Sequence, residues 1–444
     1  MKAKKLILVS AALGLSAMTA QAQNTDQLQQ ALAQAQAAAA QAQAAAKQAQ
    51  AALEQALAAA ESAKQSSKVA APAAKGDGGD GLTITNGPNS ATLYGLIDIT
   101  LFNKNAANAA GASVTAPMVS WFSGNRVGIT GSHTFSSDPS GLKAIFKLES
   151  EFESETGAMD TAGVIFNRDA WLGLQSKSLG KLTFGRQNAL ARDPAASAVY
   201  GDPYGSAKAS TEEGGYTNNN NFKQLIFYAG SANGTRINNG VVWKKEFDNG
   251  LVGGLAYSFG GVVDSFNTGS STTASLAYNG NGFTLAGFAT TANVANLTHQ
   301  TVSIGGNVQI GPLVRINAGY FNYTAQQAAA LGNRTDNAWT ISTKITPPGA
   351  FDYELGYQVM SASNAGAAAA TGYVQNAYSD TSAITRVATG DRRTLYGSVF
   401  YHLDKSTEFY LAFDQLTTTG TYLAAQANGA TSATEVGLGM RFKF

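Results

Sequence analysis

Apolar and polar residues alternate with a period of two over most of the chain, from Leu82 to the C-terminus. In the last segment one face carries Val436, Leu438, Met440, Phe442 and Phe444, and the other carries Glu435, Gly437, Gly439, Arg441 and Lys443. Such alternation indicates β-strands with one apolar and one polar face. It fits both a membrane barrel and a soluble sandwich, so the spacing of the strands must decide between them.

Sixteen strands are predicted, near residues 91–102, 119–135, 142–154, 164–175, 181–187, 235–247, 250–260, 272–279, 283–291, 300–310, 312–323, 336–346, 351–360, 393–403, 407–417 and 434–444. Their connections alternate strictly between short turns, such as 176–180, 248–249 and 404–406, and long loops, such as 103–116, 188–234, 361–392 and 418–433. An even strand number with this alternation is typical of an outer-membrane barrel, whose short turns face the periplasm.

Lipid cannot hydrogen-bond an open sheet edge, so the first strand of such a barrel must pair with the last. The predicted fold class is therefore all-β: a 16-stranded antiparallel transmembrane β-barrel over residues 82–444. The loop 188–234 is far longer than an ordinary connection, which by itself suggests a function for it.

The first 81 residues follow other patterns. Residues 1–22 combine an early lysine cluster, an apolar stretch and the small-residue site Ala20-Gln21-Ala22, and they predict a cleaved export signal. Residues 23–69 are mostly Ala and Gln, with glutamines seven apart, and they predict a periplasmic α-helical coiled coil. A solvated low-complexity spacer is the alternative there. Residues 70–81 contain Pro72 and four glycines and predict a flexible linker.

Composition and charge narrow the function. Charged residues make up 13% of the chain, about half the usual quarter. Lys and Arg number 30 against 29 Asp and Glu, without the basic surplus that nucleic-acid binding needs. Cys is absent, which excludes disulfides and thiolate metal sites. The three histidines are far apart in the sequence, and we find no catalytic triad, metal motif or phosphate loop. We therefore expect no enzymatic activity and no cofactor.

Several strings in the barrel region resemble the Gram-negative general porins, in particular their beta-proteobacterial branch. They are Ala91-Thr-Leu-Tyr-Gly-Leu-Ile-Asp98, Ser123-Gly-Asn-Arg-Val-Gly-Ile-Thr-Gly131, Gly141-Leu-Lys-Ala-Ile-Phe-Lys-Leu-Glu-Ser150, Phe166-Asn-Arg-Asp-Ala-Trp-Leu-Gly-Leu174, Leu182-Thr-Phe-Gly-Arg-Gln187 and Gly437-Leu-Gly-Met-Arg-Phe-Lys-Phe444. The resemblance runs in consistent order along the barrel region and leaves out the alanine-rich segment.

This resemblance implies an outer-membrane homotrimer that lets small hydrophilic solutes and ions diffuse through a water-filled channel. It also implies that the third outer loop, here 188–234, folds into the lumen and narrows it. The Pro-Glu-Phe-Gly motif that enteric members carry in that loop is absent here. The alternative function is structural, with the coiled coil acting as a tether or spacer between the outer membrane and peptidoglycan.

Selectivity in such a channel needs opposite charges across a narrow passage. The candidate basic residues are Arg126, Arg168 and Arg236, which the resemblance carries over by motif, together with Lys143, Lys147 and Arg186. The candidate acidic residues on the long loop are Asp193, Asp202, Glu212 and Glu213. Alternation supports an inward Arg126, because Val127 and Ile129 then face lipid, whereas Arg168 shares the parity of Leu172. Ordinary structural ion pairs are the alternative role. The basic excess predicts a weak preference for anions.

Aromatic residues suggest two further features. Those near predicted strand ends suggest girdles at the membrane interfaces: Tyr94, Phe102, Trp121, Trp171, Trp243, Tyr257, Phe321 and Tyr401. The terminal Phe444 ends an alternating strand and resembles the family's signal for the barrel-assembly machinery, which would make that machinery a partner. A girdle role is the alternative for Phe444.

Overall fold

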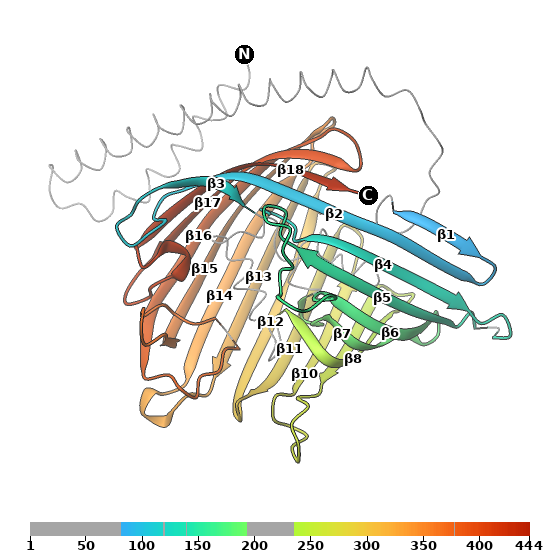
Figure 1. Cartoon of the computed structure of the whole chain (residues 1–444), viewed down its shortest axis with the longest axis horizontal. Coiled ribbons are helices and arrows are strands. Elements are labelled where there is room, and N and C mark those ends of the chain that lie inside the picture. The colour runs from blue at the N-terminus through green and yellow to red at the C-terminus, as the bar shows by residue number, and fades with distance from the viewer. Residues whose placement is uncertain (1–80, 119, 139, 193–234, 377) are drawn as a thin grey trace. The chain divides into compact units, whose positions relative to one another are not determined.

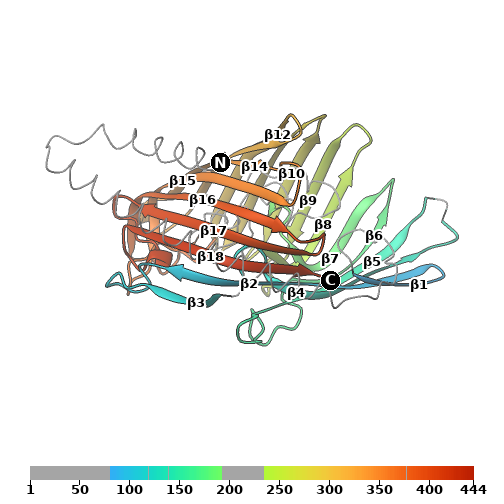
Figure 2. The same cartoon turned by 90° about the horizontal axis from the view of Figure 1, so that it is seen from above.

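The computed structural model describes residues 81–118, 120–138, 140–192, 235–376 and 378–444. The predicted export signal, the coiled coil and all of the linker except Gly81 lie outside these residues. In the described part the long elements are strands, and they form one antiparallel sheet that closes on itself (Figures 1 and 2). No helix in this part of the chain has both the length and the apolar character needed to cross a membrane.

The strands are β1 (Leu82–Asn86), β2 (Asn89–Lys104), β3 (Val114–Met118), β4 (Asn125–Thr134), β5 (Lys143–Phe152), β6 (Asp169–Ser176), β7 (Gly180–Asn188), β8 (Arg236–Glu246), β9 (Leu251–Ser258), β10 (Ser271–Asn279), β11 (Phe283–Val294), β12 (Leu297–Ile310), β13 (Val314–Ala325), β14 (Arg334–Ile345), β15 (Phe351–Ala367), β16 (Arg386–His402), β17 (Thr407–Thr418) and β18 (Ser432–Lys443). Two short 3-10 helices, η2 (Ala329–Leu331) and η3 (Ala425–Ala427), lie in connections.

Within the described residues, sixteen strands, β2 and β4 to β18, follow one another around the wall. Each is antiparallel to its neighbours, and β18 closes the barrel by pairing with β2 from Glu435↔Lys104 to Lys443↔Leu96. The predicted 16-stranded antiparallel barrel is thus confirmed. The strand β1, which the pattern did not predict, pairs with the first part of β2, beyond the end of β18. The strand β3 pairs with the last part of β2.

The two faces of the wall differ as the alternation predicts. In β12 the apolar Val302 and Ile304 are exposed on the outer face, at 57% and 66%, while Thr301 and Ser303, which alternate with them, face inward and are buried. The same outward apolar belt runs through Leu172 in β6, Leu255 in β9 and other strands. An apolar outer face with a polar inner face is the arrangement that lipid outside and water inside require.

A charge placed on the outer belt should therefore destabilise the barrel. For Ile304→Arg, in the middle of β12, we expect a loss of about 2–4 kcal/mol of unfolding free energy in lipid, because the guanidinium must enter hydrocarbon. Gln300→Arg is the matched control, since it lies on the same outer face of β12 close to the strand end and should cost about 1 kcal/mol or less. Urea unfolding in vesicles measures both, and equal losses would contradict this placement of the belt.

The connections place short turns at one end of the barrel, here called the turn end: 135–142, 177–179, 247–250, 280–282, 311–313, 346–350 and 403–406. The described residues of the opposite end, the loop end, are 105–118, 120–124, 153–168, 189–192, 235, 259–270, 326–333, 368–376, 378–385 and 419–431. One connection there breaks the predicted strict alternation. Strands β11 and β12 are joined by Ala295 and Asn296 alone, both with positive φ, as in a tight hairpin turn.

Other boundaries also differ from the prediction. The predicted strand 119–135 begins only at Asn125, because residues 120–124 leave the wall and fold inward. The predicted strand 164–175 begins at Asp169. Strands β15 and β16 extend further than predicted, so the loop between them shortens from 361–392 to 368–385.

The predicted aromatic girdle is wrong at several positions. Trp121 is 1% exposed and lies inside the barrel, and Phe321 is fully buried on the inner wall. Tyr94 donates its hydroxyl to the inward carboxylate of Glu149 at 2.7 Å, and Trp171 donates its indole N–H to Asp169 at 3.1 Å. The reason is physical: an aromatic residue fills an inner wall as well as it fits a membrane interface, so its position near a strand end does not decide the face.

Candidate pore constriction

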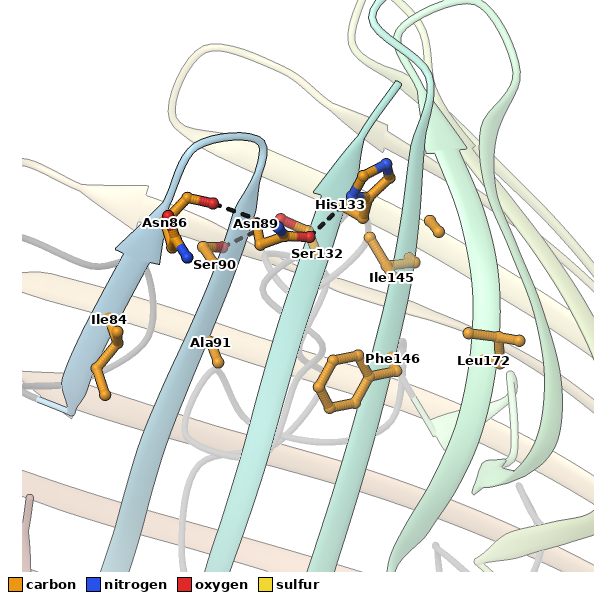
Figure 3. Close-up of a pocket in the computed structure, with 11 residues that line it drawn as sticks. Ile84, Asn86, Asn89, Ser90, Ala91, Ser132, His133, Ile145, Phe146 and Leu172 are labelled. Atoms are coloured by element: carbon orange, nitrogen blue, oxygen red, sulfur yellow. Dashed lines mark hydrogen bonds between the residues drawn. The ribbon is translucent and has the colours of Figure 1, made fainter. Parts of the chain in front are cut away.

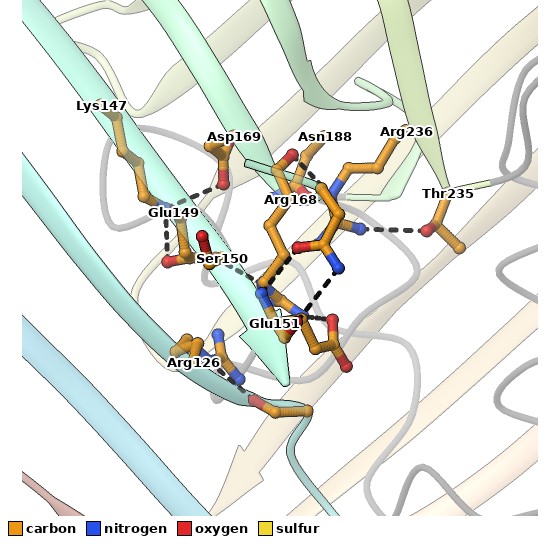
Figure 4. Close-up of polar contacts among 12 residues, drawn as sticks. Arg126, Lys147, Glu149, Ser150, Glu151, Arg168, Asp169, Asn188, Thr235 and Arg236 are labelled. Atoms are coloured by element: carbon orange, nitrogen blue, oxygen red, sulfur yellow. Dashed lines mark hydrogen bonds and ion pairs between the residues drawn. The ribbon is translucent and has the colours of Figure 1, made fainter. Parts of the chain in front are cut away.

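Charged side chains gather on the inner face of five neighbouring strands, β4 to β8, and on the residues that flank them (Figure 4). We call this surface the basic wall. Its cations are Arg126, Lys143, Lys147, Arg168, Lys181, Arg186, Arg192, Arg236 and Lys244, and its carboxylates are Glu149, Glu151, Glu153 and Asp169. Cations therefore outnumber carboxylates about two to one there, whichever pairs they form.

Two cations bind three of the carboxylates. The Nζ of Lys147 lies 3.2 Å from Glu149 and 3.1 Å from Asp169. The guanidinium of Arg168 contacts both Glu149 and Glu151. Since these groups are buried or nearly so, each charge needs a partner of opposite sign inside the wall. Glu149 and Glu151 thus serve as supports for the basic wall.

Arg168 points inward although its parity matches the outward Leu172. It precedes Asp169, the first residue of β6, and so lies outside the regular alternation of the strand. Its backbone N–H donates to the carbonyl of Glu149 at 3.2 Å, which holds the residue against β5. The family motif indicated the inward direction, and alternation alone did not.

Three arginines share one mode of attachment, in which Nε donates to a backbone carbonyl. Arg126 bonds the carbonyl of Gly124 at 3.0 Å. Arg186 bonds that of Asn167 at 2.7 Å, and Arg236 bonds that of Arg168 at 3.2 Å. Each guanidinium is therefore fixed at one edge by the main chain. Arg168 and Arg192 both lie close enough to Arg236 to repel it.

The structure brings together five of the six basic candidates: Arg126, Lys147, Arg168, Arg186 and Arg236. The sixth, Lys143, lies on the same face but opens β5 at the turn end, four residues from Lys147, or about 13 Å along the strand. The acidic candidates Asp193, Asp202, Glu212 and Glu213 lie outside the described residues. Sequence reasoning missed Asp169 and the cations Lys181, Arg192 and Lys244. For Asp169 a signal existed, because it follows Arg168 in the same motif.

The terminal Phe444 extends the pairing of β18 with β2. Its N–H donates to the carbonyl of Gly95 at 3.1 Å, and its carbonyl accepts from the N–H of Gly95 at 2.8 Å. The ring lies over Gly95, where a Cβ atom would come within 2.3 Å of it. The C-terminus is thus integrated into the closing seam of the barrel.

A hollow of about 330 Å³ lies near the turn end of β1, β2 and β4 to β6 (Figure 3). Ile84, Phe146 and Leu172 line it, and Asn89 and His133 form a hydrogen bond of 2.8 Å beside them. Leu172 is 62% exposed on the outer face. The hollow is therefore on the outside of the barrel and does not belong to the basic wall.

The fold and this surface define a class: a membrane-spanning β-barrel with an apolar outer belt and a charged interior. The model of the Gram-negative porin family matches residues 30–421, which is most of the chain. The chain belongs to the Gram-negative porin family and, with it, to the outer membrane.

Individual relatives agree with this assignment. An outer membrane porin protein of Bordetella pertussis is 31% identical over 184 residues, which cover 38% of this chain and 43% of that protein. The match therefore spans less than half of the relative's length. Among solved structures, an anion-selective porin from Comamonas acidovorans matches with a TM-score of 0.61 and 20% identity, covering 80% of this chain and all of that one.

Two more distant structures share the fold. OmpT of Vibrio cholerae in a trimer form has a TM-score of 0.54 at 15% identity and covers 80% of this chain and 99% of its own. The outer membrane channel DcaP of Acinetobacter baumannii has a TM-score of 0.52 at 12% identity, with coverage of 81% and 99%.

Proposed function

We propose that the protein is a passive diffusion channel of the outer membrane for small hydrophilic solutes and ions, with a preference for anions. The observation that carries this proposal is the basic wall, where nine cations face inward with four carboxylates. The structural relative from Comamonas acidovorans, itself named anion-selective, supports the same direction.

The electrostatic reasoning is simple. A fixed charge acts on a passing ion with about 332/(εr) kcal/mol, and the low-dielectric protein around a narrow passage concentrates this field. A wall with an excess of fixed cations lowers the energy of an anion in the lumen and raises that of a cation. No chemical step is involved, so solutes move down their own gradients.

Planar bilayer recordings test this proposal. We expect single channels whose conductance is ohmic and rises in proportion to salt, and a zero-current potential of the anion-preferring sign across a potassium chloride gradient. Arg126→Ala should move that potential towards cations, while Lys143→Ala, at the turn end, should move it less. A purified protein that conducts no ions would refute the channel. A cation-preferring wild-type potential would refute the selectivity alone.

The proposal extends to assembly as a homotrimer. The structure of OmpT with the same fold is that of a trimer form. For the present chain we expect conductance to appear in steps of three and purified protein to migrate as a trimer in mild detergent. Single, independent steps would argue for a monomeric channel.

A further inference from the structure

Residues 120–124 interrupt the second strand position of the barrel wall, and we call them the inner bulge. Before the bulge in the chain, β3 pairs with Thr100 to Lys104 of β2. After the bulge, β4 pairs with Asn89 to Leu96 of the same strand. Between them the chain leaves the sheet. Trp121 and Phe122 are only 1% and 3% exposed, so the bulge is packed against protein and is not a loose loop.

The bulge packs on the inside of the barrel. The ring of Phe122 lies 4.7 Å from the ring of Phe400 and 4.7 Å from that of Tyr410. Phe400 and Tyr410 belong to the buried inner face of β16 and β17, whose outward neighbours such as Leu395 and Phe413 are exposed. The bulge therefore covers the inner wall of the last strands and occupies space in the lumen.

A glycine makes room for it. Gly437 of β18 lies beneath the indole of Trp121, and a Cβ atom there would come within 2.6 Å of Trp121 Cε3. Such a separation is well inside van der Waals contact. An alanine at position 437 would therefore push Trp121 away from the wall.

Polar contacts lock the backbone of the bulge. One carboxylate oxygen of Asp98 accepts the N–H groups of Phe122 and Ser123, at 3.2 and 2.9 Å. Arg441 donates to the Ser123 hydroxyl at 2.9 Å, and its guanidinium lies 5.7 Å from the centre of the Phe122 ring. The bulge is thus held by β2 and β18, the two strands that close the barrel.

The bulge also reaches the basic wall. The carbonyl of Gly124, its last residue, accepts the Nε–H of Arg126. A Cβ on Gly124 would lie 1.8 Å from a carboxylate oxygen of Glu151. Residues 120–124 therefore occupy part of the lumen and also orient Arg126.

We propose that the inner bulge is a second constriction element, which sets the width of the channel and positions Arg126 for ion selection. This inference rests on the proposed channel function. Trp121 and Phe122 are the rings packed between the bulge and the inner wall, so they set how far the bulge stands into the lumen, and Gly124 is a positioning residue that acts through Arg126.

Single-channel recording of two variants with opposite expected effects tests the proposal. Trp121→Ala/Phe122→Ala removes the rings between the bulge and the wall and should raise conductance by about 1.5-fold, because the bulge backbone can then settle closer to the wall and the lumen widens. Gly437→Ala keeps every bulge residue but pushes Trp121 into the lumen, and it should lower conductance. The control is Tyr396→Ala, an inner-wall aromatic of β16 that is likewise packed over a glycine, Gly356 of β15. It should leave the zero-current potential unchanged.

The link to Arg126 has its own readout. Trp121→Ala/Phe122→Ala should move the zero-current potential towards cations, and adding Arg126→Gln should move it no further than Arg126→Gln alone. If Trp121→Ala/Phe122→Ala and Gly437→Ala both left the conductance unchanged, with trimers intact, the bulge would not set the channel width. Fully additive potential shifts would refute the positioning role. Absence of conductance in the wild type would instead refute the channel itself, which keeps the two failures distinct.

Discussion

Arg168→Met should strongly reduce the anion preference of the channel. A charge about 6 Å from a passing ion contributes about 0.7 kcal/mol in water. The contribution has opposite signs for anions and cations, so the anion-to-cation permeability ratio should fall by up to about tenfold. The zero-current potential across a salt gradient measures this ratio directly.

The same variant should be less stable, because Glu149 and Glu151 both bind Arg168 in a buried setting. Removing one partner of such a network costs about 3–5 kcal/mol. Arg168→Lys is the matched control, since it keeps the charge but not the two-sided contact, and it should retain most of the selectivity with part of the stability loss. An unchanged potential in Arg168→Met would show that Arg168 does not act on ions in the lumen.

The second large effect concerns the seam of the barrel. In Asp98→Ala the N–H groups of Phe122 and Ser123 and the hydroxyl of Tyr410 lose their acceptor. Each buried donor left unsatisfied costs about 1–3 kcal/mol, so the total should be about 3 kcal/mol or more. Because Trp121 lies in the bulge that Asp98 holds, tryptophan fluorescence during urea unfolding is a suitable measurement.

Asp404→Ala provides the comparison. Asp404 also accepts two backbone N–H groups, from Ser406 and Thr407, at 2.8 and 2.7 Å. It lies in the exposed turn 403–406, where water replaces the lost acceptor, so we expect a loss below about 1 kcal/mol. If the two variants lost the same stability, burial at Asp98 would not be the cause.

Much of the barrel could be predicted because lipid acts on every strand in the same way. Each residue of β12 or β18 faces either hydrocarbon or the interior. The sequence therefore alternates between apolar and polar residues, as in Val302, Ser303 and Ile304. Closure then follows from the absence of hydrogen-bonding partners in lipid.

Alternation alone does not determine how side chains pack inside the barrel, and the prediction of the interior was incomplete. Trp121 and Phe122 are apolar, so a period-two pattern places them in a strand. In the structure Trp121 packs over Gly437 of β18, and Phe122 packs against Phe400 and Tyr410, which are all far away in the chain. Arg168 depends on where β6 begins, which alternation does not specify. The turn at Ala295 and Asn296 lacks the Asn-Gly pair that usually marks such a hairpin, and it was therefore predicted as a longer connection.

The tight β11–β12 turn also bears on how the barrel forms. Closing a loop costs about 0.6 kcal/mol more for each doubling of its length, so this hairpin avoids about 2 kcal/mol that the loop 368–385 imposes on β15 and β16. Its twelve consecutive residue pairs, from Phe283↔Val308 to Val294↔Leu297, are then mostly local in sequence. Local contacts form early because little chain entropy is lost before they are made. We therefore expect the β11–β12 hairpin to form early and to nucleate folding of the central part of the sheet.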